Sequence, residues 1–304
     1  MTVFGNKAAG FDRPAQLPCD DDEHRRWQIA NRDWWEAAPM RYDWRAELRQ
    51  TPGTEAFFAE IDRRFLEAAK CFMPWRNLPF ETVIPFDQLH DRDVLEIGVG
   101  HGTHAQLLAR RCKSFTGIDL TTAAVRMTAQ RLRLFGLPGR VLQMDAENLA
   151  FPDRSFDFVW SWGVVHHAAD TRRVLKEAYR VLRPGGGCTA MVYYRSWWNY
   201  YVFWLLRGLL QGQWRSPHHV SQSGTDGALA RYYKPGEWRA MAHGLFNVEA
   251  IEVYGLKSDI VPLPHSRLKD VLMCLIPDAV ARFLARHLRM GSLLVVQMRK
   301  PVSA

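Results

Sequence analysis

The 304-residue sequence predicts an α/β fold with a mostly parallel sheet. From residue 93 onward, short branched apolar runs alternate with segments of helical periodicity, which is the pattern of βαβ units. The first apolar run, 93–97, passes directly into the glycine-rich segment 98–102. Before it, residues 23–70 carry apolar side chains at helical spacing, with a Pro-Gly turn near residue 52. We therefore expect helices on both faces of a parallel sheet, preceded by a helical cap.

The expected elements follow from these periodicities. Strands are predicted at 93–97, 115–118, 141–144, 156–160 and 188–193, and helices at 103–111, 121–135 and 171–182. A later helix, strand, helix and strand are predicted at 235–244, 246–253, 277–288 and 292–298. The predicted domains are a disordered tail at 1–22, a helical N-terminal cap at 23–90, and a main domain at 91–304 with substrate-cap insertions at about 196–233 and 255–290.

Composition narrows the class of protein. Hydrophobic residues make up 47% and charged residues 24%, so the chain can bury a core. The apolar stretch 197–210 is shorter than the about 20 residues that span a bilayer, and residues 1–10 lack the apolar segment of a signal peptide. Five widely spaced cysteines without a C-x-x-C pair favour reduced thiols in the cytoplasm over disulfides or zinc, and no metal site is predicted.

Glycines and carboxylates at the expected strand ends indicate a nucleotide-like ligand. Gly98, Gly100 and Gly102 end the first strand and open a helix, so the backbone can approach a ligand closely. Asp119 ends the second strand, where a carboxylate accepts hydrogen bonds from ribose hydroxyls. Nicotinamide enzymes share both features, and this leaves a dinucleotide as an alternative ligand.

Three further features favour an adenosyl sulfonium over a pyrophosphate. Glu96 at the end of the first strand suits the ammonium of a methionine moiety. Asp145-Ala146-Glu147 closes the third strand, where a carboxylate can accept from an adenine amino group. The segment 182–187, Leu-Arg-Pro-Gly-Gly-Gly, ends a helix and turns directly into a strand.

These motifs resemble the class I S-adenosylmethionine-dependent methyltransferases, in the type 11 branch that includes ubiquinone and menaquinone C-methyltransferases. The resemblance covers 93–195 and rests on residues 94–103, 116–121, 145–153, 155–157, 163–167 and 180–186. It implies a Rossmann-like sheet whose last strand is antiparallel, with S-adenosylmethionine as cofactor and S-adenosylhomocysteine as product. The cofactor-binding residues that it implies are Glu96, Gly98, Val99, Gly100, Asp119, Leu120, Asp145, Ala146, Glu147 and Trp162. One departure from the family is His104, where relatives often carry an acidic residue.

Candidate residues for catalysis and acceptor binding lie after the fourth and fifth strands and in the cap. His166 and His167 follow strand four, where an imidazole can act as general base or can be a structural residue. The substrate-binding candidates are aromatic: Trp34, Trp35, Tyr42, Tyr193, Tyr194 and Trp198. Either these aromatic residues pack the core or they form an apolar lid over a cationic donor.

The sequence therefore predicts in-line methyl transfer to a small acceptor that is hydrophobic, or aromatic and lipid-like, in small-molecule biosynthesis. The alternatives are a nicotinamide-dependent oxidoreductase and a non-catalytic S-adenosylmethionine-binding protein. A nucleic-acid acceptor is disfavoured, because residues 161–165 lack the Asp/Asn-Pro-Pro-aromatic motif of amino-methylating enzymes. The net charge is +8, and the helix predicted near 278–289 has a basic face for either solvent or an anionic membrane. No pattern predicts an oligomeric state.

Overall fold

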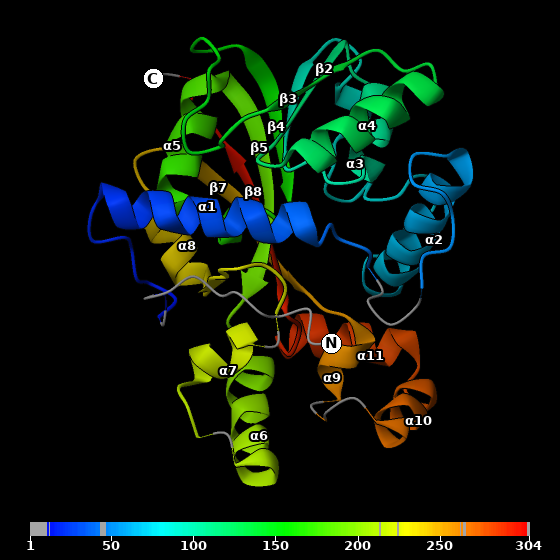
Figure 1. Cartoon of the computed structure of the whole chain (residues 1–304), viewed down its shortest axis with the longest axis vertical. Helices are drawn as coiled ribbons and strands as arrows, with labels where there is room; N and C mark the ends of the chain where they lie inside the picture. Colours follow the sequence, from blue (N-terminus) through cyan, green and yellow to red (C-terminus); the bar gives the residue numbers. More distant parts are fainter. Residues whose placement is uncertain are drawn as a thin grey trace.

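The computed structural model describes residues 11, 13–42, 47–212, 214–223, 225–261, 263 and 266–302. Its centre is an eight-stranded sheet in the order β3-β2-β1-β4-β5-β8-β7, with β6 beside β5 (Figure 1). The strands are β1 (Asp93–Ile97), β2 (Ser114–Asp119), β3 (Arg140–Gln143), β4 (Phe156–Trp162), β5 (Leu182–Tyr194), β6 (Tyr232–Tyr233), β7 (Asn247–Tyr254) and β8 (Leu293–Arg299). Strands β1 to β6 pair in parallel, and the last strand, β8, is antiparallel to β5 and β7. This arrangement confirms the predicted fold class.

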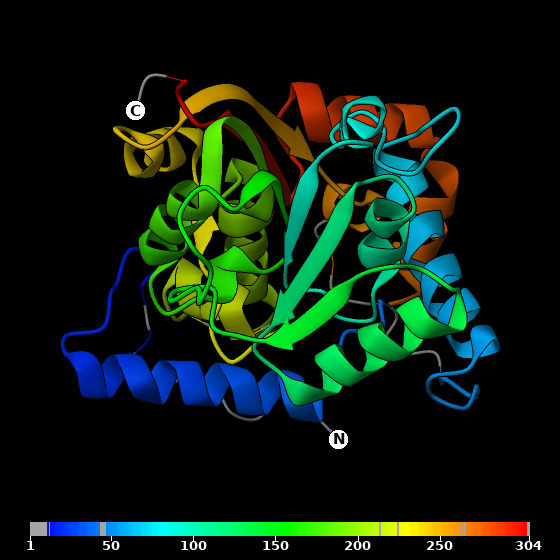
Figure 2. The ribbon, with the colours of Figure 1, turned by 90° about the horizontal axis from the view of Figure 1, so that it is seen from above.

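Helices cover both faces of the sheet because side chains alternate along each strand (Figure 2). Leu95 and Ile97 of β1 point into one apolar layer, which α5 (Thr171–Val181) and α8 (Pro235–Ala242) complete. Val94 points into the other layer, with α2 (Glu55–Phe72), α3 (Thr103–Ala109) and α4 (Thr122–Leu134). The short helix η1 (Phe86–Gln88) precedes β1, and η2 (Val165–His167) follows β4.

The first helix, α1 (Asp21–Ala37), lies across the C-terminal ends of the parallel strands (Figure 1). Asp20 caps it, and Glu36 near its end accepts a hydrogen bond from the backbone N–H of Ala123 at 3.1 Å, at the start of α4. Residues 1–10 and 12 of the predicted tail lie outside the described residues. The buried Phe11 packs edge-to-face on Trp27, with ring centroids 5.1 Å apart, which differs from the prediction of a disordered tail because Trp27 offers this residue an apolar surface.

Two insertions extend beyond the strand ends, at the lower end of Figure 1. The first contains η3 (Trp197–Val202), α6 (Phe203–Gln211) and α7 (Pro217–Ser223), and the second contains α9 (Lys257–Ile260), α10 (Arg267–Leu275) and α11 (Asp278–His287). The indole nitrogens of Trp197 and Trp198 join them, donating to the carbonyls of Leu288 (2.9 Å) and Ile260 (3.2 Å). Within the described residues, no helix has the length and apolar character that crossing a bilayer requires.

Candidate functional site

A cavity of about 440 Å³ lies at the C-terminal edge of the sheet, where ligands bind in parallel α/β folds. One end of it, the loop end, is lined by residues that end or follow β1 to β3: Gly98, Val99, Gly100, Asp119, Leu120, Asp145 and Ala146. The opposite part, the apolar end, is lined by Phe65, Phe72, Met191, Leu256 and Leu293. Met191 is on β5 and Leu293 on β8, so β4 separates the two ends across the sheet.

The glycine loop after β1 needs glycine for two different reasons. Gly98 has a φ of 81°, and a Cβ there would lie 2.7 Å from Cγ1 of Val164 and still closer to Cγ2. Gly100 has a φ of 52°, and no described atom lies within 4 Å of the position its Cβ would take. The backbone at Gly100 therefore borders open space, which leaves room for a ligand to approach it.

Hydrogen bonds from the glycine loop after β1 and from the loop after β2 fix the side chain of Asp119. Its Oδ1 accepts hydrogen bonds from the backbone N–H (3.0 Å) and the hydroxyl (2.8 Å) of Thr121, and its Oδ2 accepts from the N–H of Gly100 (3.2 Å). Burial raises the pKa of Asp119, and these hydrogen bonds act in the opposite direction. Each oxygen retains acceptor capacity, so a polar ligand could be held here.

Glu96 lies behind the loop and is absent from the residues that line the cavity. Its side chain is buried, and its Oε2 has no hydrogen-bond partner among the described residues. Burial, and secondarily the charge of Asp119, raise its pKa well above the ordinary value for a glutamate. A buried acceptor without a partner is costly, so this oxygen is a candidate to accept a hydrogen bond from a ligand or from a bound water.

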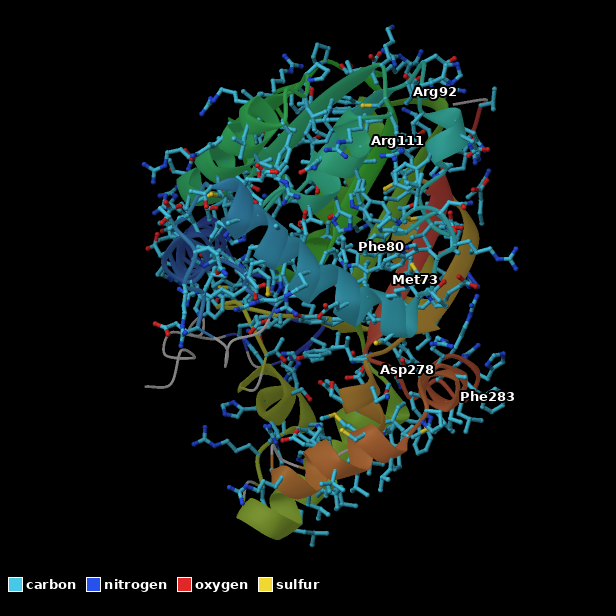
Figure 3. All side chains as sticks on the ribbon, turned by 90° about the vertical axis from the view of Figure 1, so that its right-hand side faces the viewer. Met73, Phe80, Arg92, Arg111, Asp278 and Phe283 are labelled. Carbon is cyan, nitrogen blue, oxygen red and sulfur yellow. The ribbon has the colours of Figure 1, made fainter. Side chains whose placement is uncertain are left out.

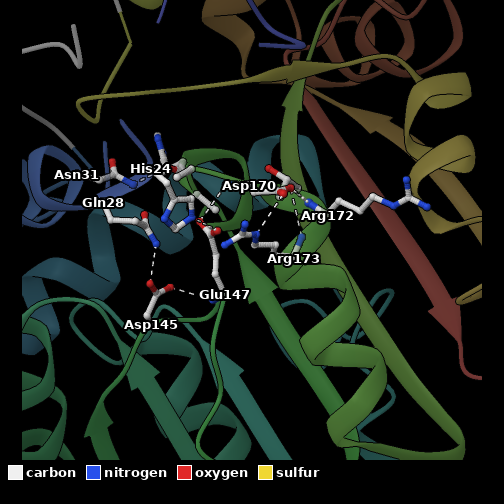
Figure 4. Close-up of polar contacts among 12 residues, drawn as sticks. His24, Gln28, Asn31, Asp145, Glu147, Asp170, Arg172 and Arg173 are labelled. Atoms are coloured by element: carbon white, nitrogen blue, oxygen red, sulfur yellow. Dashed lines mark hydrogen bonds and ion pairs between the residues drawn. The ribbon is translucent and has the colours of Figure 1, made fainter. Parts of the chain in front are cut away.

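Helix α1 supplies polar contacts to the end of β3 (Figure 4). Nε2 of Gln28 donates to Oδ2 of Asp145 at 2.8 Å, while Oδ1 of Asp145 accepts from the backbone N–H of Glu147 at 2.8 Å. Glu147 itself points away from the cavity: its Oε2 lies 2.7 Å from Nε2 of His24, and its Oε1 accepts from the N–H of Asp170 at 3.0 Å. Asp145 and Ala146 thus face the cavity, whereas Glu147 ties α1 to the start of α5.

The two adjacent histidines of η2 have different surroundings. His167 lines the cavity, and its Nδ1 lies 2.7 Å from the carbonyl oxygen of Leu229, so Nδ1 carries the proton and the lone pair is on Nε2. Asn31 of α1 donates to the backbone carbonyl of His167. His166 is fully buried against the ring of Tyr193, and burial lowers its pKa well below the ordinary value. Of the two, only His167 is among the described residues that line the cavity.

The aromatic candidates divide between the cavity wall and the core. Trp35, Tyr42 and Tyr193 line the cavity, as does Trp162 at the end of β4. Trp162 stacks on Trp160 with ring centroids 5.5 Å apart and planes 12° apart, and this contact holds the Trp162 ring in place. The other three candidates lie outside the cavity wall: Trp34 is buried beside Trp35, Tyr194 is in the core with α5 and α8, and Trp198 packs on α9 and α11.

The charge of the cavity wall is one-sided. The wall contains three carboxylates, Asp119, Asp145 and Asp226, and no Lys or Arg is among the described residues that line it. His101 and His104 also line it, but burial lowers the pKa of His101 to about 4 and of His104 to about 3. Both rings are therefore neutral at physiological pH, and the cavity suits a cationic or an uncharged ligand better than an anion.

Several wall residues were not predicted from the sequence. Gln28 and Asn31 are three residues apart and so share one face of α1, but nothing local indicated what that face covers. Thr121 follows Asp119 closely enough to have been identified as its partner. Asp226 lies in the loop after α7, and its charge, after the larger effect of burial, contributes to a raised pKa of the Tyr193 hydroxyl. This hydroxyl therefore stays protonated and can donate a hydrogen bond.

Comparison with known proteins places this site in a family. A family of methyltransferase domains matches residues 95–190. The phthiotriol/phenolphthiotriol dimycocerosates methyltransferase of Mycobacterium tuberculosis is 43% identical over 112 residues, which are 36% of this chain and 40% of that protein. The fatty-acid O-methyltransferase of Mycolicibacterium smegmatis is 41% identical over 95 residues, 31% of this chain and 34% of that protein. The chain thus matches less than half the length of these curated relatives.

Similarity to a solved structure extends further along the chain. A candidate methyltransferase from Bacillus halodurans superposes with a TM-score of 0.51 and covers 73% of this chain and 98% of its own. Its sequence is 18% identical, so this similarity concerns the fold. Together with the strand order and the matched motifs, these findings confirm the family resemblance. Residues 95–190 of the chain thus match a methyltransferase domain, which is built on a Rossmann-like sheet.

Proposed function

We propose that this protein transfers the methyl group of S-adenosylmethionine to a small, uncharged, lipid-like acceptor by in-line displacement. The observation that carries the proposal is a single cavity that joins the loop end, with its glycines and carboxylates, to the apolar end. A methyl transfer requires both partners in one enclosed space, with the reacting atoms aligned. The cytoplasmic location that the cysteines favour remains a prediction.

The loop end fits S-adenosylmethionine in shape and charge. The open space at Gly100 would accommodate the methionine half, together with Gly98 and Val99. For Glu96, which lies behind this loop, we propose that the unpartnered Oε2 accepts a hydrogen bond from the methionine ammonium. Asp119 and Leu120 would hold the ribose, and Asp145 and Ala146 the adenine edge, with Trp162 below. When bound, S-adenosylmethionine supplies an electrophilic methyl on a positively charged sulfur, which a wall with carboxylates and without Lys or Arg accommodates.

The residues between the two ends would handle the acceptor atom. His167 is positioned by Leu229 and Asn31, so its Nε2 lone pair would take the proton of an acceptor hydroxyl as the new oxygen–carbon bond forms and the carbon–sulfur bond breaks. The protonated Tyr193 hydroxyl would orient the acceptor, and Trp35 and Tyr42 would exclude water. Trp34, Tyr194 and Trp198 would act through packing.

The apolar end supports an acceptor with a hydrocarbon part. Phe65, Phe72, Met191, Leu256 and Leu293 present carbon atoms to the cavity, and burial of an apolar chain against them contributes about 25 cal/mol per Å². The names of the two mycobacterial relatives also describe lipid substrates. A fatty-acid carboxylate would lack a cationic partner in this wall, so we favour an uncharged hydroxyl or carbon acceptor.

Calorimetry and label transfer test this proposal. Wild-type protein is expected to bind S-adenosylhomocysteine and not NAD, and Asp119→Asn to weaken that binding at least about tenfold, or 1.4 kcal/mol. Asp91→Asn, at an exposed carboxylate before β1, is the matched control and should leave the affinity unchanged. Labelled methyl from S-adenosylmethionine should enter the lipid fraction of an extract. Binding of NAD instead would contradict the cofactor assignment, and binding without transfer would indicate a non-catalytic protein.

A further inference from the structure

Helices α10 and α11 present apolar side chains to the outside of the molecule. Leu268, Val271 and Leu275 recur along one side of α10 and are exposed, Leu275 by 72%. On α11, Ala281 and Ala285 face the core, yet Val280 and Phe283 are exposed as well, Phe283 by 54%. Figure 3 shows Phe283 directed away from the sheet. A helix that only covers a core would carry polar residues on its outer side, so these two helices have more apolar surface than packing requires.

The first insertion, at the same end of the molecule, also carries exposed apolar side chains (Figure 1). Trp197 of η3 is half exposed and contacts Leu288, itself exposed, through the hydrogen bond from its indole nitrogen. Farther along, Leu205 and Leu209 are one turn apart on α6, and both are exposed. We call the exposed residues Leu268, Leu275, Val280, Phe283, Leu288 and Leu209 the apolar surface.

Positive charge accompanies the apolar surface. Residues 267–289 contain five basic residues, Arg267, Lys269, Arg282, Arg286 and Arg289, against two acidic ones, Asp270 and Asp278. Arg267 and Arg289 are exposed, whereas Lys269 is buried and Arg286 pairs with Glu252. Residues 196–225 contain Arg207 and Arg215 and no acidic residue. Exposed apolar side chains flanked by Arg are the combination that binds the interface of an anionic bilayer.

The apolar surface also adjoins the apolar end of the cavity. Nη1 of Arg282 donates to the carbonyl of Cys71 at 3.0 Å, which holds α11 beside Phe72, a residue of the cavity wall. Leu256, another wall residue, immediately precedes α9, and α9 packs against α11. A lipid that leaves a bilayer at α11 would therefore have only a short distance to travel to the wall.

We propose that the apolar surface docks the protein on anionic phospholipid bilayers, from which a lipid-like acceptor reaches the cavity. The second part rests on the proposed function, whereas the docking itself needs no methyl transfer. Both halves of the interaction are present on one end of the molecule: side chains that enter the acyl boundary and cations that pair with lipid phosphates.

Vesicle sedimentation of the full chain tests the docking. Wild-type protein should bind phosphatidylcholine vesicles that contain phosphatidylglycerol at least about tenfold more strongly than pure phosphatidylcholine vesicles. The double variant Leu275→Ser with Phe283→Ser should lose about tenfold in binding to the mixed vesicles. Arg267→Glu should weaken binding to the mixed vesicles alone.

The controls separate docking from folding and from catalysis. Leu134→Ser alters a similarly exposed leucine at the end of α4 and should leave vesicle binding unchanged. Unchanged affinity for S-adenosylhomocysteine in each variant would show that the cofactor domain is intact. If the wild-type protein does not bind S-adenosylhomocysteine, that result counts against the proposed function and not against docking. Wild-type protein that stays in the supernatant would overturn the docking proposal. A dimer would also overturn it: if light scattering shows that the wild-type protein is a dimer and that the double variant is a monomer, the apolar surface is a dimer interface.

Discussion

The loop end of the cavity is made of backbone that follows consecutive strands, whereas the apolar end is assembled from side chains of distant segments. Gly98, Asp119 and Asp145 sit at the ends of β1, β2 and β3, and hydrogen bonds within the loops fix them. Phe72, Leu256 and Leu293 come from α2, from the segment before α9, and from β8, and contacts between distant segments bring them together. Cofactor binding at one end and acceptor binding at the other should therefore respond to different substitutions.

Substitution of His167 is expected to have the largest effect, because this residue lies where the two ends meet. His167→Gln should lower the rate of methyl transfer about 100- to 1000-fold, the usual contribution of a general base. Affinity for S-adenosylhomocysteine should change by less than about threefold, since the ring is assigned to the acceptor proton. Label transfer into the lipid extract and calorimetry measure the two quantities. His219→Gln, an exposed histidine in α7, is the control, and an unaffected rate in His167→Gln would remove the base from the mechanism.

Gly98→Ala should destabilise the fold at the loop end. The new Cβ would overlap the side chain of Val164, and alanine is strained at a φ of 81°, so the free energy of unfolding should fall by about 3 kcal/mol. Gly236→Ala is the matched control, because no described atom lies within 4 Å of its Cβ position. Denaturation with urea measures both variants. Wild-type stability and cofactor affinity in Gly98→Ala would show that the glycine is not required there.

Leu256→Trp tests whether a change at the apolar end affects acceptor methylation without affecting cofactor binding. The larger side chain would occupy volume in the cavity wall, so transfer to a lipid-like acceptor should fall at least about tenfold. Affinity for S-adenosylhomocysteine should stay within about twofold, because the loop end lies across β4 from this residue. Leu256→Met preserves the volume and should behave as wild type. Equal losses of transfer and cofactor affinity in Leu256→Trp would mean that the two ends are coupled.

The same contrast explains what the sequence could predict. The strands, the helices on the sheet and the loop end follow from contiguous runs, because glycines and carboxylates at strand ends are local signals. Adjacent aromatic residues could not be assigned to the cavity or the core from the sequence. Trp34 and Trp35 are about 100° apart on α1, and Tyr193 and Tyr194 point to opposite faces of β5, so only one of each pair lines the cavity.

Other assignments depended on contacts between segments far apart in the sequence. Glu147 was predicted to bind the cofactor, but its carboxylate instead contacts His24, 123 residues away. The residues of the apolar end had no common motif, because packing selects them by position and not by spacing. The strand β6 was also not predicted, since two residues carry no periodicity.

The smallest expected change in the free energy of unfolding concerns Asp259, which fixes the segment behind the apolar end. Its Oδ2 accepts hydrogen bonds from the N–H of Leu256 (2.9 Å) and from the N–H (3.1 Å) and hydroxyl (2.6 Å) of Ser292. It therefore links the wall residue Leu256 to Ser292, which precedes the wall residue Leu293. Burial raises the pKa of Asp259 from 3.8 to about 6 in the folded chain. Because the folded pKa exceeds the unfolded one, the contribution is fully present below about pH 4 and is lost as the pH rises through about 6.

Asp259→Asn should reduce this pH dependence by about 2 kcal/mol, because asparagine keeps an acceptor oxygen and carries no charge. The free energy of unfolding, measured in urea between pH 4 and pH 7, should therefore fall less with rising pH in the variant than in the wild type. Asp270→Asn, at an exposed carboxylate on α10, should reproduce the wild-type slope. Identical slopes in all three proteins would show that Asp259 is ionised as readily in the folded chain as in the unfolded one.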